Sequence, residues 1–218
     1  MIRAIVTIDG IDGSGKSTFA RRIASAFETA GIASGIVRVD DFRREVVWGK
    51  GDSEADVYYA DYYDLVSCER VLRTFLDGGP ALDLPAWDMA TERISGTRNV
   101  DLRAVNVVVV EGVFPRRLPS AARGLGIYLT ASEEEARRRI LERDQKKGRT
   151  AEEVQRRIDH RYFPTQRRYH EQFSPQEHAD VLIDNEQPRA PRIIAQDLRR
   201  LHPDLRPILD GALRVTTV

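Results

Sequence analysis

The chain has 218 residues, enough for one α/β domain with its own hydrophobic core and a small insertion. Its 34 basic and 34 acidic side chains balance, so no overall charge attracts nucleic acid or a membrane surface, and neither partner is expected. No apolar run approaches the ~20 residues of a membrane span, and no charged-then-apolar leader is visible. The single Cys68 fits a reducing compartment, so we expect a cytoplasmic protein whose oligomeric state, a homo-oligomer included, stays open.

The first element in chain order is an apolar strand, residues 4–9, that runs into a glycine-rich turn and then a helix from about Ser17 to Thr29. The turn satisfies G-x-x-x-x-G-K-S/T, the P-loop pattern, in its required strand–loop–helix context. Such a loop turns its N–H groups toward phosphate oxygens, and the helix dipole assists. The predicted nucleotide-binding residues are Gly10, Asp12, Gly13, Ser14, Gly15, Lys16, Ser17 and Thr18. Lys16 is expected at the β- and γ-phosphates and the Ser17 hydroxyl at Mg²⁺; the alternative is a glycine turn that binds nothing.

The next segments read as a short strand at 36–39, a polar loop from Arg43 to Asp56, and a helix from Asp61 to Leu76 that Gly78 ends. Two short strand-like pieces around a polar turn predict a β-hairpin insertion at about 81–104. The valine run at 105–110 is typical of a strand buried on both faces of a parallel sheet. Residues 127–129 predict another strand.

The C-terminal third is predicted to be mainly helical. Ser132 and Thr150 each begin a capping-box pattern, which predicts helices from 132 to about 147 and from 150 to about 160, with Pro164 as a break. A late strand is expected at 181–183 and a final helix at about 191–201, and the tail after His202 is ambiguous. This alternation of strands and helices predicts an α/β fold with a parallel sheet flanked by helices.

Three acidic residues follow strands of that sheet, where the carboxyl ends of parallel strands face one crevice. Asp40 and Asp41 follow the second strand, and Glu111 ends the valine strand. One carboxylate of the pair could accept the proton of an attacking hydroxyl, and the other could cap the next segment. Asp40 is the predicted base. Glu111 is predicted to act at Mg²⁺ or the acceptor, the alternative being a solvated strand end.

The helix that begins at Ser132 is rich in arginine, the side chain that matches phosphoryl geometry with two donors. Together with the next helix, to about residue 160, it could close over ATP as a lid. Arg139 and Arg143 are four residues apart, hence on one face, and are the predicted phosphate contacts. Pairs such as Glu135 with Arg139 would equally decorate an exposed helix.

Aromatic residues suggest an acceptor pocket. Trp87 in the hairpin could stack on a substrate ring or fill the core. Tyr58 could line the same pocket, although helical spacing also favours packing.

These motifs, in this order over about residues 3–185, resemble the uridine kinase-like P-loop kinases, the group that includes phosphoribulokinase and pantothenate kinase. The residues that carry the resemblance are Gly10–Thr18, Asp40-Asp41-Phe42, Pro85-Ala86-Trp87-Asp88, Val110-Glu111-Gly112, Arg143-Asp144 and Ala179–Ile183. The resemblance implies a three-layer P-loop NTPase fold, a single kinase domain over 1–218, and transfer of the ATP γ-phosphate to a small-molecule hydroxyl. It places Asp40 as the base, Trp87 at an acceptor ring, and Asn185 and Pro188 beside adenine.

The chain departs from uridine kinases on the acceptor side. Their Phe-Asp-His-Pro segment, whose aspartate binds ribose, is replaced here by Ala55-Asp56-Val57-Tyr58, so Asp56 is the remaining counterpart. Their histidine after the aromatic position is missing, and Glu92 is nearby. We therefore expect Asp41, Phe42, Asp56, Tyr58, Trp87 and Glu92 to shape the acceptor pocket.

The function expected from the sequence is an ATP- and Mg²⁺-dependent kinase with a nucleoside-like acceptor. A kinase for a vitamin, sugar or other small alcohol is the alternative within this class. A regulatory P-loop NTPase is the alternative outside it, and the chain lacks the N-K-x-D pattern of guanine-specific switches.

Overall fold

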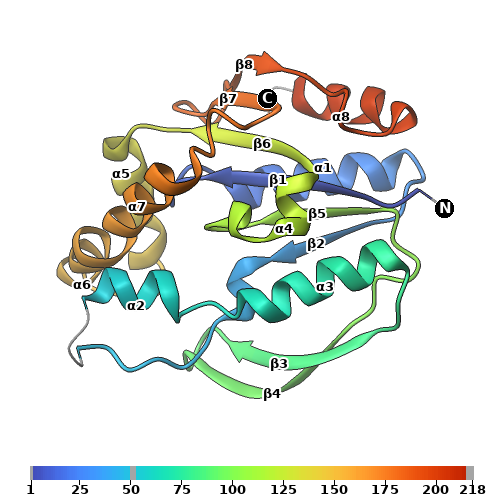
Figure 1. The fold of residues 1–218 in the computed structure, drawn as a ribbon. Coiled ribbons are helices and arrows are strands. Elements are labelled where there is room, and N and C mark those ends of the chain that lie inside the picture. Colours follow the sequence, from blue (N-terminus) through green and yellow to red (C-terminus); the bar gives the residue numbers. More distant parts are fainter. Residues whose placement is uncertain (1, 50–52, 215–218) are drawn as a thin grey trace.

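The centre of the fold is a six-stranded sheet in the order β2-β5-β1-β6-β7-β8 (Figure 1). The computed structural model describes residues 2–49 and 53–214. The strands of the sheet are β1 (Ala4–Gly10), β2 (Ser34–Arg38), β5 (Val107–Glu111), β6 (Leu125–Thr130), β7 (Val181–Asp184) and β8 (Arg192–Gln196). The first five are mutually parallel and β8 is antiparallel to β7, so the predicted parallel sheet is confirmed.

Eight α-helices accompany the sheet in the described part of the chain. They are α1 (Lys16–Thr29), α2 (Glu54–Ala60), α3 (Leu65–Asp77), α4 (Pro119–Arg123), α5 (Glu133–Gln145), α6 (Ala151–Arg157), α7 (Phe163–Phe173) and α8 (Arg206–Arg214). Figure 1 shows α5, α6 and α7 gathered at the end of the sheet to which the parallel strands point. They therefore lie at the edge where the P-loop and the strand-end carboxylates are found.

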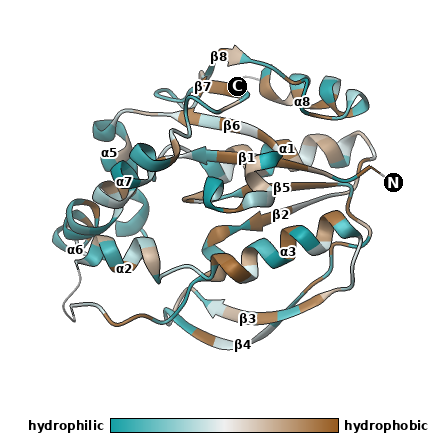
Figure 2. Cartoon of the chain, viewed as in Figure 1, coloured by the Kyte–Doolittle hydropathy of each residue, from teal (hydrophilic) through white to brown (hydrophobic). Residues whose placement is uncertain are grey.

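The valine strand β5 separates two hydrophobic cores. Val107 and Val109 belong to the cluster built with α1 and α8, whereas Val108 and Val110 belong to the cluster built with α3, α5 and α7. Successive side chains of a strand point to opposite faces, so a run of valines buries both. In Figure 2 the central strands are largely brown, whereas α5 and α6 are mostly teal. The prediction of a doubly buried strand is thus confirmed.

The predicted insertion is a separate two-stranded antiparallel sheet. It consists of β3 (Leu82–Asp88) and β4 (Arg93–Val100), joined by a short turn. In Figure 1 the hairpin lies beyond α3, below the main sheet in this view. Its tip reaches the end of the molecule where α6 and α2 lie, and it supplies one wall of the site described below.

Two sequence-based boundaries are wrong in the first half of the chain. The segment from Arg43 to Asp56 is not a loop throughout, because α2 begins at Glu54 with the Ser53 hydroxyl as its N-cap. Residues 50–52 of that loop lie outside the described residues. The helix expected from Asp61 begins at Leu65, where the Asp64 side chain accepts a hydrogen bond from the Ser67 N–H. In both cases a cap decides the helix start.

Two predictions fail in the C-terminal part. Pro164 does not break the helical path, because it lies in the first turn of α7, directly after a π-helical segment at Ile158–Tyr162, where its missing N–H costs little. The helix expected at 191–201 is instead the edge strand β8, which pairs with the free edge of β7. The ambiguous tail contains the amphipathic helix α8.

Cys68 is a free, buried thiol in α3, as the packing interpretation expected. Within residues 2–49 and 53–214, no helix combines the length and the apolar character needed to cross a membrane.

Candidate active site

The P-loop joins β1 to α1 and is held in close contact with its surroundings. Gly13 (φ +80°) and Gly15 (φ +101°) are in the left-handed region. A Cβ on Gly13 would lie 2.6 Å from the carbonyl oxygen of Ala136 in α5, and one on Gly15 would lie 2.6 Å from the Asn185 amide nitrogen. Only glycine adopts a positive φ freely and also has no Cβ to collide with these neighbours, so the shape of the loop follows from its sequence.

Lys16 is buried at the first position of α1. Its Nζ donates to the main-chain carbonyls of Gly10 (2.9 Å) and Ile11 (2.8 Å), which fold it back along the loop. Asp12 lines the cavity beside the loop, and the Gln166 amide donates to it at 3.2 Å. Ser14 is fully buried and Thr18 is exposed on α1. The Lys16 ammonium group therefore lies inside the loop, at the position where the P-loop pattern predicts phosphate binding.

Ser17 and Glu111 form the candidate magnesium site. The Ser17 hydroxyl lies 3.1 Å from each carboxylate oxygen of Glu111, which is 5% exposed at the end of β5. Burial raises the pKa of Glu111, and the charge of Lys16 opposes the shift. A hydroxyl and a carboxylate are oxygen donors of the kind that Mg²⁺ takes alongside nucleotide phosphates, so the pair fits this ion. Among the described residues, no group of three or more His, Cys, Asp and Glu side chains forms a metal cage of its own.

Asp40 and Asp41 follow β2 in a short 3-10 turn (Val39–Phe42) and have different environments. Asp40 lines the main cavity, accepts a hydrogen bond from the Tyr63 hydroxyl (3.1 Å) and pairs with Arg43 (3.0 Å). Enclosure disfavours its charge, but Arg43 and Tyr63 outweigh this and lower the pKa of Asp40. Burial raises the pKa of Asp41, which does not line that cavity. The structure therefore offers Asp40, ionised, to a ligand in the cavity.

The two predicted lid arginines do different things. Arg143 lines the cavity and is oriented by Asp144, whose carboxylate lies 2.7 Å from the Arg143 Nε. Arg139 donates to the carbonyls of Gly13 (3.1 Å), Asn185 (2.9 Å) and Glu186, and to the Glu135 carboxylate. Arg139 thus ties α5 to the P-loop and to the segment after β7, with its donors already used.

The segment after β7 also contacts the P-loop. Asn185 is 2% exposed and its amide donates to the Ser14 carbonyl at 2.6 Å, whereas Pro188 is exposed. This places the segment beside the loop, where the resemblance expects adenine.

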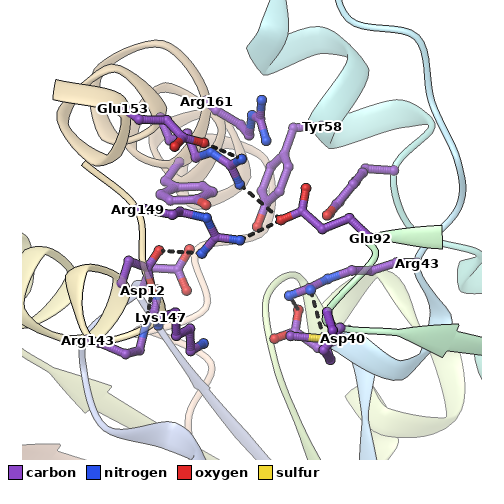
Figure 3. A pocket seen from close by; sticks show the side chains of 16 residues that line it. Asp12, Asp40, Arg43, Tyr58, Glu92, Arg143, Lys147, Arg149, Glu153 and Arg161 are labelled. Carbon is purple, nitrogen blue, oxygen red and sulfur yellow. Dashed lines mark hydrogen bonds and ion pairs between the residues drawn. The ribbon is translucent and has the colours of Figure 1, made fainter. Parts of the chain in front are cut away.

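The main cavity has a volume of about 740 Å³ and lies between the P-loop, the hairpin tip and the lid. Figure 3 shows Glu92 reaching in from the hairpin toward Arg149 of the lid, with Tyr58 above it and Asp40 below it in this view. An adjoining cavity of about 570 Å³ shares Tyr62, Glu92, Arg157 and Arg161 with it and is lined by Trp87. The hairpin and lid therefore enclose one connected space.

The predicted acceptor residues divide into two sets. Tyr58, Glu92 and Trp87 line this space, so the structure brings them together. Phe42 is buried in the core under Arg98, and Asp56 is on the outer side of α2, paired with Arg168.

Sequence reasoning missed several cavity residues: Arg43, Lys147, Arg149, Arg157 and Arg161. Glu153, Arg157 and Arg161 recur at four-residue spacing, which puts them on one helical face and could have revealed that face. Lys147 lies among like charges, and its pKa is lowered by burial and by Arg143. The lid side of the cavity is therefore strongly cationic.

Comparison with known proteins places the chain among P-loop proteins. The family model described as an AAA domain matches residues 6–160, which is more than half of the chain. No curated protein sequence matches it.

Solved structures share the fold. One is described as a possible uridine kinase from Bacillus stearothermophilus, with 24% identity, a TM-score of 0.66, and coverage of 84% of this chain and 89% of that one. Another is classed provisionally as a fructose transport system kinase from Silicibacter, with 19% identity, a TM-score of 0.61, and coverage of 78% and 85%. Phosphoribulokinase from Rhodobacter spheroides follows, with 15% identity, a TM-score of 0.56, and coverage of 84% and 70%. The expected fold is confirmed: the chain belongs to the AAA domain family of P-loop proteins and has the fold seen in uridine kinase-like proteins and phosphoribulokinase.

Proposed function

We propose that the protein is a small-molecule kinase that transfers the γ-phosphate of ATP to a hydroxyl group, with Mg²⁺ as cofactor. One observation carries the proposal: Asp40 lines the same cavity as the P-loop residue Asp12 and the lid residue Arg143. A base, a phosphate-binding loop and a cation around one enclosed space are the parts that phosphoryl transfer needs. The fold shared with proteins described as kinases supports the same class.

Each part has a role in this mechanism. The loop N–H groups and Lys16 would bind the phosphates of ATP, and Ser17 and Glu111 would hold Mg²⁺, which would supply positive charge against the phosphates. Asp40 orients the acceptor hydroxyl and takes its proton. Arg143 and Lys147 stabilise the charge of the transferring group. The lid and hairpin exclude water, which would otherwise compete with the acceptor.

The acceptor is proposed to be nucleoside-like, because Tyr58 and Tyr62 line the main cavity with Asp40, and Trp87 adds an aromatic surface in the adjoining cavity. A kinase acting on another small alcohol is the alternative within the class. An NTPase that only hydrolyses nucleotide would not need the adjoining cavity on the acceptor side.

The test is ATP turnover with and without a panel of nucleosides, sugars, hydroxy acids and phosphorylated alcohols, with label on the γ-phosphate. We expect label to move to at least one panel member in a reaction that needs Mg²⁺, with Lys16→Met as the inactive control. ATP loss at the same rate without any acceptor, and no labelled organic product, would overturn the kinase proposal in favour of the NTPase.

A further inference from the structure

Glu92 stands out in the connected space because it reaches the lid from the tip of the hairpin. It is in the left-handed region (φ 53°), and its carboxylate contacts Arg149 (2.5 Å) and Arg157 (3.5 Å), both on the lid (Figure 3). Enclosure opposes its charge, but these two arginines outweigh this and lower its pKa. The hairpin thus places one anion between two lid cations.

The two arginines are aimed at this spot by carboxylates of the lid itself. Asp144, 1% exposed at its side chain, binds Arg149 at 3.2 Å, and Glu153 binds Arg157 at 2.6 Å. Both guanidinium groups would therefore keep their direction if Glu92 moved away. The Glu92 side chain, in contrast, is 42% exposed and hangs from a short turn.

The lid presents more cations than carboxylates to the main cavity. Among the described residues, its lining takes from the lid Arg143, Lys147, Arg149, Arg157 and Arg161, against the carboxylates of Asp144 and Glu153. In the adjoining cavity the arginines are more nearly matched, since Arg44 pairs with Asp64, and Arg156 and Arg161 pair with Glu54. The Arg157 Nε is buried without a hydrogen-bond acceptor among the described residues. Buried donors of this kind favour an oxyanion.

This cationic end adjoins the end that would bind ATP. Arg143 and Arg149 both line the main cavity and share the Asp144 carboxylate, whereas Arg157 and Arg161 also line the adjoining cavity. The P-loop, Lys16 and Arg143 would bind the phosphates of ATP. Arg157, which faces the adjoining cavity, and Arg149, which Glu92 links to it, are therefore assigned to the acceptor.

We infer that the acceptor is an anion: besides the hydroxyl that is phosphorylated it carries a carboxylate or a phosphate, which Arg149 and Arg157 bind in the place of the Glu92 carboxylate. The anion site stands on the geometry alone, and its assignment to the acceptor rests on the proposed kinase function. A neutral nucleoside would leave both arginines to Glu92. Binding of an acidic acceptor frees Glu92 from the lid, so Glu92 acts as an internal competitor.

The test uses inorganic phosphate and malonate as probes, titrated calorimetrically into the protein saturated with Mg²⁺ and a non-hydrolysable ATP analogue, which fills the P-loop. We expect at least one anion to bind with millimolar affinity. Arg157→Gln should weaken this binding about tenfold or more, because it removes a charge-assisted contact. Glu92→Gln should tighten it several-fold. Arg138→Gln, on the solvent face of α5, is the matched control and should change nothing.

The outcomes separate this inference from the kinase proposal. Binding of phosphate alone indicates a phosphorylated acceptor, and binding of malonate alone indicates a carboxylic acid. The inference is overturned if neither anion binds the nucleotide-loaded protein, or if Glu92→Gln binds them no more tightly than the unchanged protein. If the anions bind and the three variants change their affinity as expected, but no acceptor yields a phosphorylated product, the kinase proposal is overturned. The anion site then stands, and only its assignment to an acceptor is lost. Phosphorylation of neutral alcohols without anion binding defeats only the present inference.

Discussion

At the scale of single residues, the candidate site contains two consecutive aspartates whose surroundings differ. Asp40 and Asp41 are adjacent in sequence, yet the first faces the cavity with Arg43 and Tyr63, and the second lies outside it. Arg43 lowers the pKa of Asp40 below its usual value, so that Asp40 is ionised at neutral pH, whereas burial raises the pKa of Asp41. The local sequence is the same for both, and the fold separates their roles.

The two aspartates predict different kinetics. Asp40→Asn should lower kcat by ~10²–10⁴-fold with ATP affinity kept, because a general base is lost and the P-loop is untouched. Asp41→Asn, the matched control, should stay within a few-fold of the unchanged enzyme. Steady-state kinetics with a turnover-competent acceptor, beside direct ATP binding, checks both. If Asp41→Asn carries the large loss instead, the assignment is reversed.

Asp9 predicts a pH dependence of stability. It is buried beside the P-loop, accepts hydrogen bonds from Tyr169 (2.6 Å) and the Gly10 N–H (2.7 Å), and burial raises its pKa from 3.8 to about 6. Between these values the folded state holds a proton that the unfolded state has lost, so the stabilisation is complete below pH 4 and disappears as pH rises through 6. A shift of about two units corresponds to roughly 3 kcal/mol.

The measurement is chemical denaturation of the unchanged protein and Asp9→Asn from pH 4 to 7.5. The free energy of unfolding of the unchanged protein, relative to the variant, should fall by roughly 3 kcal/mol across this range, since the other titrating groups cancel. A constant difference would mean that Asp9 titrates alike in both states.

At the scale of elements, the lid helix α5 and the P-loop are packed backbone against backbone. Gly13 approaches Ala136, and Arg139 adds a hydrogen bond to the Gly13 carbonyl. The N-caps expected at Ser132 and Thr150 are present, each hydroxyl accepting from the N–H three residues on, but the Ser132 N–H bonds Glu186 and not Glu135, so the expected capping box is not completed there. Local sequence thus starts the lid helices, and tertiary contact positions them against the loop.

Gly13→Ala tests this packing. Its Cβ would meet Ala136 at 2.6 Å from the carbonyl oxygen, so nucleotide affinity should fall about tenfold or more as α5 or the loop shifts. Gly148→Ala is the control, since Gly148 also has a positive φ (+88°) but no described atom lies within 4 Å of its would-be Cβ. It should cost only about 1 kcal/mol of stability. Equal losses of nucleotide affinity in both variants would contradict the packing argument.

At the scale of the whole molecule, two cores on opposite faces of the sheet hold the site in place. The face away from the lid is closed by α8, whose Leu209 and Leu213, with Leu205 of the turn before it, pack in one cluster with α1, the helix that follows the P-loop. The other face packs α3, α5 and α7 around the aromatic cluster behind Asp40. The sheet therefore connects the nucleotide loop with both cores.

Leu209→Ala should lower the free energy of unfolding by about 2–5 kcal/mol, because the side chain is fully buried between α8 and the sheet. Ile194→Ala in β8, where the side chain is 58% exposed, is the control and should stay within about 0.5 kcal/mol. Denaturant unfolding measures both. A loss below about 1 kcal/mol for Leu209→Ala would mean that α8 adds little to the core.

The sequence by itself determined the P-loop, the doubly buried valine strand, the hairpin and the starts of the lid helices. These features depend on residues a few positions apart, on glycines that allow a positive φ, and on the periodicity of apolar side chains. Short segments of the sequence contain all of this information. Asp40 and Glu111 became candidates through the rule that parallel strands end at one edge of the sheet, and Ser17 through the P-loop pattern.

Only the tertiary structure decided which of the thirty arginines serve the cavity. Arg157 and Glu92 are 65 residues apart, and Arg139 contacts the loop across 126 residues, so no local pattern relates them. The strand β8 likewise needs the open edge of β7, which exists only after the sheet has formed. The ion-pair partners of long side chains depend on which charged groups the fold brings close to them. The residues on the proposed acceptor side of the site therefore could not be predicted from the sequence.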